Sequence, residues 1–307
     1  MRWQSMQIGW SASFLALALL LSGCSGDSAT GAPAGGEAPA AAGAGGKPAE
    51  EQHRIVSTTV AATQFTDALE LALVGIPTSS KELPKRYDGV TKVGNPMTPN
   101  MEIVKSLDPT EVLSVTTLEY DLAPVFKNAG IQGNFLDFTS LEKMNQAILD
   151  IGRRYGREKQ ASALVDGYNA KVEQIRKQTE GKPQPTVLIL LGVPGSYLVA
   201  TEHSYIGDLV RLAGGKNIVQ GEKVEYLASN TEYLQQSNPD VILRAAHGMP
   251  EEVVKMFEKE FKKNDIWKHF SAVQNNRVYD LPEELFPTTG NFAVAEALDA
   301  AVKMLYP

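Results

Sequence analysis

Short apolar runs alternate with longer amphipathic stretches along most of the chain. The runs have the length and β-branched content of buried strands, and the stretches have helical periodicity. Strands alternating with helices predict largely parallel sheets and an α/β fold. We expect strands at residues 54–58, 74–78, 134–138, 187–191, 241–243 and 277–281, and helices at 62–73, 121–129, 141–154, 157–179, 206–212, 232–236, 251–263 and 292–305.

Two of these helices carry residues that disfavour helical structure. Pro124 is expected in the first turn of its helix, where a missing N–H costs little. Gly167 weakens the stretch 157–179 by about 1 kcal/mol relative to alanine. That stretch is long enough for a helix of about 35 Å. It is either a stiff connection between two halves of the protein or a surface helix of one half.

One segment of the pattern occurs twice. Residues 102–113 and 232–243 each contain a glutamate, two apolar residues, an Asp-Pro or Asn-Pro pair and a strand that ends in leucine. The repeated unit predicts two similar α/β lobes with mostly parallel sheets, joined by the single long helix. Because binding sites favour domain interfaces, we expect the ligand cleft between the lobes.

The amino-terminal 52 residues have a different composition. Residues 1–23 combine Arg2, a short apolar core and no acidic residue, which is typical of a signal peptide. The sequence Leu-Ser-Gly-Cys that ends at Cys24 resembles a bacterial lipobox, which implies cleavage before Cys24 and lipidation of that residue. Residues 24–52 are rich in Ala, Gly and Pro and should form a disordered tether.

The remaining residues are numerous enough for two lobes. We expect an N-terminal lobe at 53–156, a connecting helix at 157–180 and a C-terminal lobe at 181–307. The formal charge is −7, and it becomes −8 when the signal peptide takes Arg2 with it. This acidity argues against binding to nucleic acid. Cys24 is the only cysteine, so no disulfide is expected within the chain.

Four histidines are candidate ligands. His247 follows the buried strand 241–243 and precedes Gly-Met-Pro, so it lies where open α/β sheets bind ligands. Arg244 also follows this strand, three residues before His247, so it is expected near the same site. His203 is in a turn, His269 belongs to a helical surface pattern, and His53 borders the tether. These three are weaker candidates.

Three methionines bear on the same site. Met97 lies between two prolines in the loop 94–100, outside the helical setting in which methionine usually fills gaps in a core. It is either a ligand or a buried plug. Met101 falls on the repeated helix and is expected in the core. Met249 follows His247 too closely to bind a ligand from the opposite face.

Motifs of the common hydrolases and nucleotide-binding proteins are absent from the sequence. It contains no G-x-S-x-G, no H-E-x-x-H and no P-loop. The histidines are too few for a zinc receptor with a His-rich loop. We therefore expect no catalytic residues and a binding protein rather than an enzyme.

The lipobox, tether, two lobes and connecting helix resemble the helical-backbone class of substrate-binding lipoproteins of ABC importers, which handle haem, ferric siderophores and cobalamin. Eight strings are similar, more narrowly, to the haem-receptor lipoproteins of the staphylococcal iron-regulated surface determinant system. They are TTVA at 58–61, GNPM at 94–97, LSVT at 113–116, GVPGSYLVAT at 192–201, SYIGDLV at 204–210, SNTE at 229–232, HGMPEEV at 247–253 and KNDIWKHF at 263–270.

The resemblance implies specific roles for five residues. In that family a methionine of the first lobe and a histidine of the second bind the haem iron axially, and these match Met97 and His247. One glutamate on each lobe docks on arginines of the permease, and these match Glu102 and Glu232. Both glutamates can also be explained by the preference for acidic residues in the first turn of a helix. Cys24 is implied as the lipid-anchored residue.

The expected function is that of a membrane-anchored receptor that captures haem at the cell surface and delivers it to an ABC permease for iron acquisition. A receptor for ferric siderophores or cobalamin and a haem-dependent enzyme are the alternatives. Haem needs protein ligands from both faces of its plane, whereas a siderophore fills the iron shell itself. Two axial protein ligands would also leave no open iron position for catalysis. Expected partners are the permease, its ATPase and upstream haem-relay proteins at the cell surface. The protein is expected to be a monomer, lipid-anchored on the extracytoplasmic face of the cell membrane.

Overall fold

The computed structural model describes residues 53–229, 234 and 236–307, and their secondary structure alternates as the hydrophobic pattern predicts. The first five-stranded sheet is entirely parallel, with strand order β3-β2-β1-β6-β7. Its strands are β1 (Ile55–Ser57), β2 (Leu73–Ile76), β3 (Thr91–Lys92), β6 (Glu111–Val115) and β7 (Gly133–Leu136).

Helices cover both faces of this first sheet, and together they form the first lobe. They are α1 (Val60–Ala68), α2 (Met101–Ser106) and α3 (Glu119–Asn128), with single turns of 3-10 helix at η1 (Lys85–Tyr87) and η2 (Thr116–Leu118). Between β3 and α2 the chain forms a small antiparallel hairpin, β4 (Gly94–Asn95) and β5 (Thr98–Pro99).

Three predictions for this lobe were wrong in detail. The helix expected to reach Leu73 ends at Ala68, because Glu70 turns the chain with φ of +55° and Leu73 already begins β2. Pro124 lies inside α3, not in its first turn, since the helix begins at Glu119. The loop predicted at 94–100 is the β4–β5 hairpin, whose turn carries Pro96 and Met97.

The second sheet has strand order β11-β9-β8-β12-β13, with β10 also pairing with β8. Pairs among β8, β10, β12 and β13 are parallel, and β9 and β11 extend the sheet antiparallel. The strands are β8 (Thr186–Val193), β9 (Ser196–Ala200), β10 (Lys216–Asn217), β11 (Tyr226–Ala228), β12 (Val241–Ala246) and β13 (Val278–Leu281). β12 is longer than predicted, so Arg244 lies in the strand, not in the loop.

The second lobe is this sheet with the helices packed on its two faces. They are α6 (Tyr205–Leu212), α8 (Pro250–Lys263), η3 (Asp265–His269), α9 (Ser271–Gln274) and α10 (Val294–Leu305). The structure therefore confirms the expected fold class of two α/β lobes with mostly parallel sheets.

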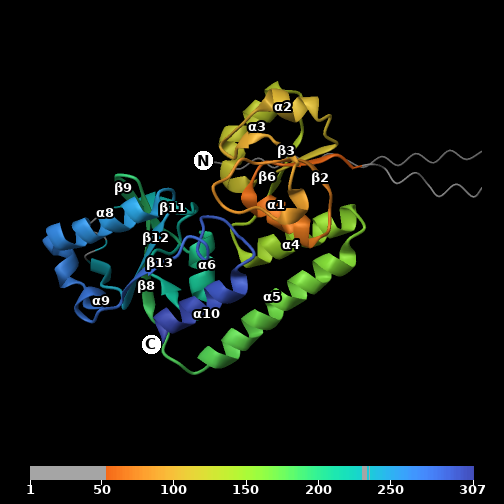
Figure 1. Ribbon diagram of the computed structural model, residues 1–307. Coiled ribbons are helices and arrows are strands. Elements are labelled where there is room, and N and C mark those ends of the chain that lie inside the picture. The colour runs from red at the N-terminus through yellow and green to blue at the C-terminus, as the bar shows by residue number, and fades with distance from the viewer. Residues whose placement is uncertain (1–52, 230–233, 235) are drawn as a thin grey trace, which may run out of the picture. The chain divides into compact units, whose positions relative to one another are not determined.

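Two consecutive helices lead from the first sheet to the second. They are α4 (Leu141–Arg154) and α5 (Glu158–Thr179), the long helix predicted from the sequence. Ser140 caps α4, and Leu141, Met144, Ile148 and Ile151 form its buried face at helical spacing. Figure 1 shows α5 beside both α4 and α10, and α5 packs against each of them.

Alternation along the strands places the cores on opposite faces of each sheet. In β12, Val241, Leu243 and Ala245 join the large core that is shared with α5, α6 and α10. Ile242 and Ala246 point to the other face, where α8, η3 and α9 supply a separate aromatic core. The large core also contains residues of both lobes, which explains why the described part of the chain forms one compact unit.

A second connection between the lobes is formed by residues 282–293, between β13 and α10, here called the return segment. Phe292 stacks on Phe65 of α1 with ring centroids 4.8 Å apart, and the N–H of Gly290 donates to the carbonyl of Phe138 at 2.8 Å. A Cβ at Gly290 would lie 2.6 Å from the Met144 sulfur and 3.3 Å from the Phe138 carbonyl, so a larger residue would force the methionine to move. At the surface, Glu283 pairs with Lys81 at 3.1 Å.

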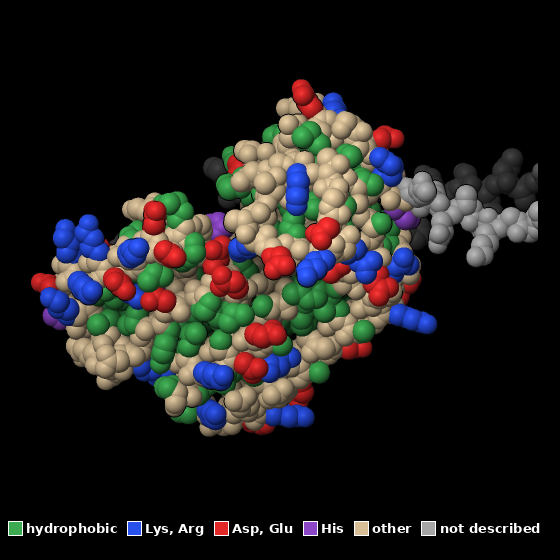
Figure 2. Space-filling model, in the orientation of Figure 1, with side chains coloured by type: hydrophobic (Ala, Val, Ile, Leu, Met, Phe, Trp, Pro, Cys, Tyr) green, Lys and Arg blue, Asp and Glu red, His purple; other side chains and the backbone are tan. Residues whose placement is uncertain are grey.

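The surface and the helices of the described part show two further features. None of its helices combines the length and apolarity needed to cross a membrane. Figure 2 shows acidic and basic side chains intermixed over the visible face. A single basic field of the kind that binds nucleic acid is therefore not present on that face.

Candidate functional site

Met97 lies at the tip of the β4–β5 hairpin, after the carboxyl end of β3. The Asn95 side chain accepts a hydrogen bond from the Met97 N–H at 2.9 Å, which fixes the turn. The hairpin is anchored at its base because the N–H of Asn100 donates to the Val93 carbonyl at 2.7 Å. The Met97 side chain is 61% exposed, so it is not the buried plug that was the alternative explanation. A soft thioether is thus presented to solvent from a fixed turn.

His247 is the first residue after β12 in the second lobe. Its N–H donates at 2.9 Å to the carbonyl of Gly192, the residue of the parallel strand β8 that pairs with Ala246. Gly248 and Met249 then both adopt positive φ, of 64° and 49°, and Pro250 begins α8. The His247 side chain is exposed, although the backbone on either side of it is held by the sheet and the helix.

Arg244 joins the sheet and α8 beneath His247. The sequence placed this residue near the candidate site but assigned it no role. Its guanidinium makes two hydrogen bonds to Asp280 of β13, at 2.8 and 2.6 Å, and lies over the rings of Phe257 and Phe261. The side chain is nearly buried, so it is a structural link between strand and helix rather than a free ligand group. Gly192 completes this packing, because a Cβ there would lie 2.3 Å from Val253.

Glu102 is exposed in the first turn of α2, as the repeat predicts. Asn100 caps this helix and accepts hydrogen bonds from the N–H groups of Glu102 and Ile103, both at 3.1 Å. Met101 packs against the core of the first lobe, which confirms the expectation for that residue. Glu232 and Cys24 lie outside the described residues.

The other three histidines lie on other segments of the chain, namely before β1 (His53), after β9 (His203) and in η3 (His269). His203 and His269 are exposed on the second lobe. His53 is exposed too, and its ring packs edge-on against Tyr155 with centroids 4.7 Å apart.

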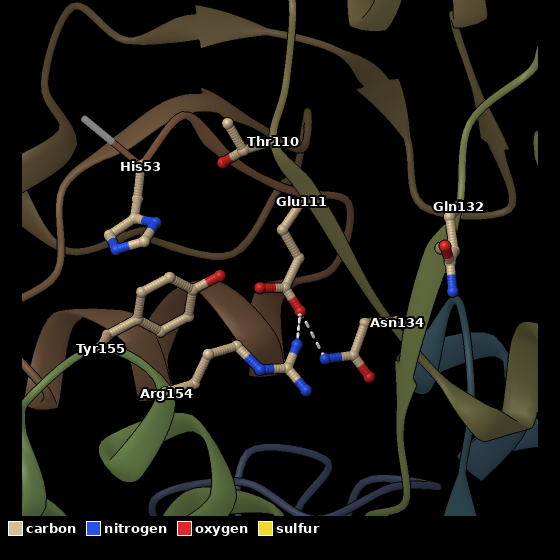
Figure 3. Close-up of a pocket in the computed structure, with 8 residues that line it drawn as sticks. His53, Thr110, Glu111, Gln132, Asn134, Arg154 and Tyr155 are labelled. Atoms are coloured by element: carbon tan, nitrogen blue, oxygen red, sulfur yellow. Dashed lines mark hydrogen bonds and ion pairs between the residues drawn. The ribbon is translucent and has the colours of Figure 1, made fainter. Parts of the chain in front are cut away.

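His53 borders a cavity of about 440 Å³ at the amino ends of β6 and β7. Figure 3 shows the side chains of His53, Tyr155, Arg154 and Glu111 around this cavity. Glu111 already accepts hydrogen bonds from Arg154 and Asn134, so its charge is compensated within the protein. The carboxyl ends of parallel strands, which carry Met97 and His247, lie at the opposite edge. The cavity is therefore not part of the candidate site, and no local sequence pattern predicts it.

Sequence reasoning missed the charged contacts that join the two lobes. The Leu141 N–H donates to the Asp208 carboxylate at 2.8 Å, and Lys81 pairs with Glu283. Asp208 in turn holds Arg211, at 2.5 Å. In each of the two contacts between the lobes, the partners are more than 60 residues apart along the chain. No local sequence pattern could therefore have indicated them.

Comparisons with known proteins agree on the type of molecule. Residues 55–285 match the profile of the family described as Periplasmic binding protein. The high-affinity heme uptake system protein IsdE of Staphylococcus aureus is 51% identical over 256 residues, which cover 83% of this chain and 88% of that protein.

Two solved structures are similar over the same share of the chain. An ABC transporter substrate-binding protein from Listeria monocytogenes EGD-e is 57% identical with a TM-score of 0.80, covering 83% of this chain and 99% of that one. The structure of S. aureus IsdE complexed with heme is 50% identical with a TM-score of 0.80, covering 83% of this chain and 100% of that one.

Proposed function

We propose that this chain, which belongs to the periplasmic binding protein family, is the haem-binding receptor of an ABC importer. The observation that carries this function is the identity of about half of all residues, over nearly the whole described body, with a haem uptake protein whose haem complex has been solved. Haem is the transported ligand, and the receptor serves iron acquisition. A siderophore or cobalamin receptor is not favoured.

Absorption spectroscopy tests this function directly. The purified body, residues 53–307, is mixed with haem, and the visible spectrum is recorded with ferric siderophore and cobalamin as competitors. We expect a stoichiometric haem complex with the sharp bands of six-coordinate iron. Displacement of haem by either competitor, or no complex at all, would contradict the proposed ligand.

Met97 and His247 are proposed as the two axial ligands of the haem iron. One side chain comes from each lobe, and both are exposed at the ends of firmly held backbone segments. A planar macrocycle leaves two axial positions open, on opposite faces, and two lobes can supply one ligand to each. With both positions filled, substrate or oxygen has no site on the iron. We therefore propose that the protein binds and delivers haem without catalysing a reaction.

Met97→Ala tests the methionine ligand. Loss of the thioether is expected to lower the reduction potential, because methionine ligation raises it. We expect haem affinity to fall by about tenfold or more, which is about 1.4 kcal/mol. Since most of the Met97 side chain is exposed, the free energy of unfolding should not change. Redox titration and haem titration measure the first two quantities.

Met101→Ala is the matched control, because it removes the same side chain from the core side of α2. It should lower the stability of the protein and leave the spectrum and potential unchanged. If Met101→Ala changes the potential and Met97→Ala does not, the methionine has been assigned wrongly.

The protein works with a permease and its ATPase, as the substrate-binding protein of an ABC importer. We propose that Glu102 and Glu232 dock on arginines of the two permease halves. Exposed ion pairs contribute only about 0–1 kcal/mol each, which suits a reversible contact. Upstream haem-relay proteins at the cell surface are proposed as donors, and the receptor is proposed to act as a monomer.

Replacing Glu102 and Glu232 together with alanine tests the docking. We expect haem binding to remain and delivery into vesicles that carry the permease to fall severalfold. Glu158→Ala with Glu180→Ala removes the same charge from two exposed positions at the ends of α5 and should leave delivery unchanged. If the first double variant delivers haem at the normal rate, Glu102 and Glu232 only stabilise the first turns of their helices.

The protein acts outside the cytoplasm at the membrane. We propose that Cys24 carries the lipid anchor after removal of residues 1–23, and that residues 24–52 link the anchor to the body. The proposed lobe boundaries remain 53–156 and 181–307, with the connecting helix at 157–180. Labelling of the expressed protein with a radioactive fatty acid tests the anchor directly. We expect the label in the wild type and no label in Cys24→Ala.

A further inference from the structure

Met249 lies two residues after His247 and departs from three local preferences of protein chains. Its φ is +49°, in the left-handed region that residues with side chains rarely adopt. It is the N-cap residue of α8, yet its side chain makes no capping hydrogen bond, whereas N-cap residues usually supply a side-chain oxygen. Its apolar side chain is also 53% exposed. A short polar residue would therefore suit the fold better at this position.

The left-handed conformation distinguishes Met249 from the other residues that adopt it. In the described part of the chain, the remaining residues with positive φ, glycines aside, are Glu70, Asp108, Asn238 and Asn276. Asp and Asn tolerate this conformation because their short polar side chains can bond to the nearby backbone. Methionine has no such compensation. Residues that break a local preference in this way are expected chiefly at functional sites.

The backbone holds Met249 in this conformation from both sides. On one side, the His247 N–H donates to the Gly192 carbonyl on β8 at 2.9 Å. On the other side, the Met249 carbonyl accepts hydrogen bonds from the N–H groups of Glu252 and Val253, at 3.0 and 3.1 Å, in the first turn of α8. Two residues span at most about 7 Å, so the Cα atoms of His247 and Met249 lie within that distance of each other.

We propose that Met249 packs against the macrocycle of haem, on the face whose axial iron position is filled by His247. The inference rests on the proposed haem function. Each face of the macrocycle has one axial position, so Met249 is not a second iron ligand on that face. A macrocycle bound through the imidazole extends past it on every side, within reach of a long side chain two residues away. Methionine is unbranched and polarizable, and it adapts readily to an apolar surface.

This contact makes Met249 a specificity-determining residue. Its exposed apolar surface is removed from water at a gain in free energy when the ligand offers apolar surface in return. The ring system of haem does so, whereas a hydrophilic iron complex does not. Met249 is thus expected to strengthen binding of the macrocycle itself, independently of the iron.

Protoporphyrin IX, which has the macrocycle but no iron, separates this contact from iron ligation. Met249→Asn is the test variant, because asparagine is polar but tolerates positive φ and leaves the turn intact. We expect the dissociation constants of haem and of protoporphyrin both to rise by about tenfold, the effect of no longer burying about half of a methionine side chain. His247→Ala should weaken haem binding far more than protoporphyrin binding. Absorption titration with haem and fluorescence titration with protoporphyrin give the constants.

Two further variants serve as controls. Met249→Leu keeps an apolar side chain of similar volume, so both dissociation constants should stay close to those of the wild type. Glu70→Asn is the matched control for the backbone, since Glu70 also has positive φ and is exposed in the first lobe, in the turn before β2. Both asparagine variants should raise the urea unfolding midpoint of the protein without ligand. Only Met249→Asn should weaken binding, so its stability and its affinity should change in opposite directions.

The contact is overturned if Met249→Asn binds haem and protoporphyrin as the wild type does. Equal losses in Met249→Asn and Met249→Leu also overturn it, because apolar surface would then not be what the ligand requires. Weaker haem binding with unchanged protoporphyrin binding would assign Met249 to the iron instead of the macrocycle. A lower unfolding midpoint in Met249→Asn would assign it a structural role. Failure of the wild type to bind haem overturns the proposed function as well, whereas each of the other results leaves that function standing.

Discussion

Replacing His247 with alanine is expected to abolish the six-coordinate haem spectrum. The imidazole is the proposed ligand from the second lobe, and it is exposed at the end of β12. We expect haem affinity to fall by about 100-fold or more, which is about 2.7 kcal/mol. Added imidazole should restore a six-coordinate spectrum, because the free ring can occupy the space left at the end of β12. Visible absorption spectra and haem titration provide both measurements.

His203→Ala is the matched control for His247→Ala. His203 is also an exposed loop histidine of the second lobe, and its Nε2 lies 3.9 Å from Glu202. Its loss should leave the spectrum and the affinity unchanged. An unaltered spectrum in the His247 variant would show that the iron is bound by another residue. Loss of the spectrum in both variants would point instead to an indirect effect on the second lobe.

The largest expected effect on stability is that of Phe65→Ala. Phe65 is fully buried, and its ring centroid lies 4.8 Å from that of Phe138 in the first lobe and 4.8 Å from that of Phe292 in the return segment. Truncation of a buried phenylalanine typically costs about 3–5 kcal/mol. Here it also removes the aromatic contact between α1 and the return segment. Urea unfolding of the body gives the change in free energy of unfolding.

Tyr120→Ala provides the contrast, because Tyr120 is 93% exposed on α3 and should change stability by no more than about 0.5 kcal/mol. A double-mutant cycle with Phe292→Ala isolates the contact itself, for which about 0.5–1.5 kcal/mol of coupling is expected. A coupling near zero would mean that the return segment is held by its other contacts alone.

Most of the fold could be predicted from the sequence because the strands and helices are strongly patterned. The run at 187–191 is the centre of β8 and the run at 241–243 is the first half of β12, the two innermost long strands of the second sheet. The amphipathic pattern of α4 and the length of α5 were equally clear. Errors occurred where the local signal was ambiguous. Leu71 and Leu73 continue the apolar pattern of α1, but the chain turns at Glu70 and Leu73 begins the next strand.

Prediction of the candidate site depended on local context. His247 follows a predicted strand and precedes Gly-Met-Pro, and Met97 lies between two prolines in a loop, so each could be singled out from its neighbours. Their assignment as a pair of ligands came from the resemblance to a family, because nothing in the spacing of residues 150 positions apart links them. Arg244 shows the limit of the local argument. Its place near His247 was visible, whereas its bond to Asp280 depends on the pairing of β12 with β13.

The contacts between the lobes could not be predicted for a related reason. Lys81 and Asp208 look like ordinary surface residues in the sequence, and their contacts with Glu283 and with the Leu141 N–H depend on the fold. The return segment has no regular pattern, yet Gly290 and Phe292 pack against the first lobe. Such effects require the three-dimensional arrangement of both lobes.

The single passage of the chain through α5 makes the protein suitable for division into two polypeptides. Every strand of the first sheet precedes α5, and every strand of the second follows it. The link 181–184 after the helix is exposed, and Gly181 has a φ of +74°. Fragments 53–180 and 181–307 would each keep a whole sheet. The stacking of Phe292 on Phe65 and the packing of α10 on α5 provide a surface for their reassociation. Because the two fragments carry one proposed iron ligand each, haem colour would report the complementation.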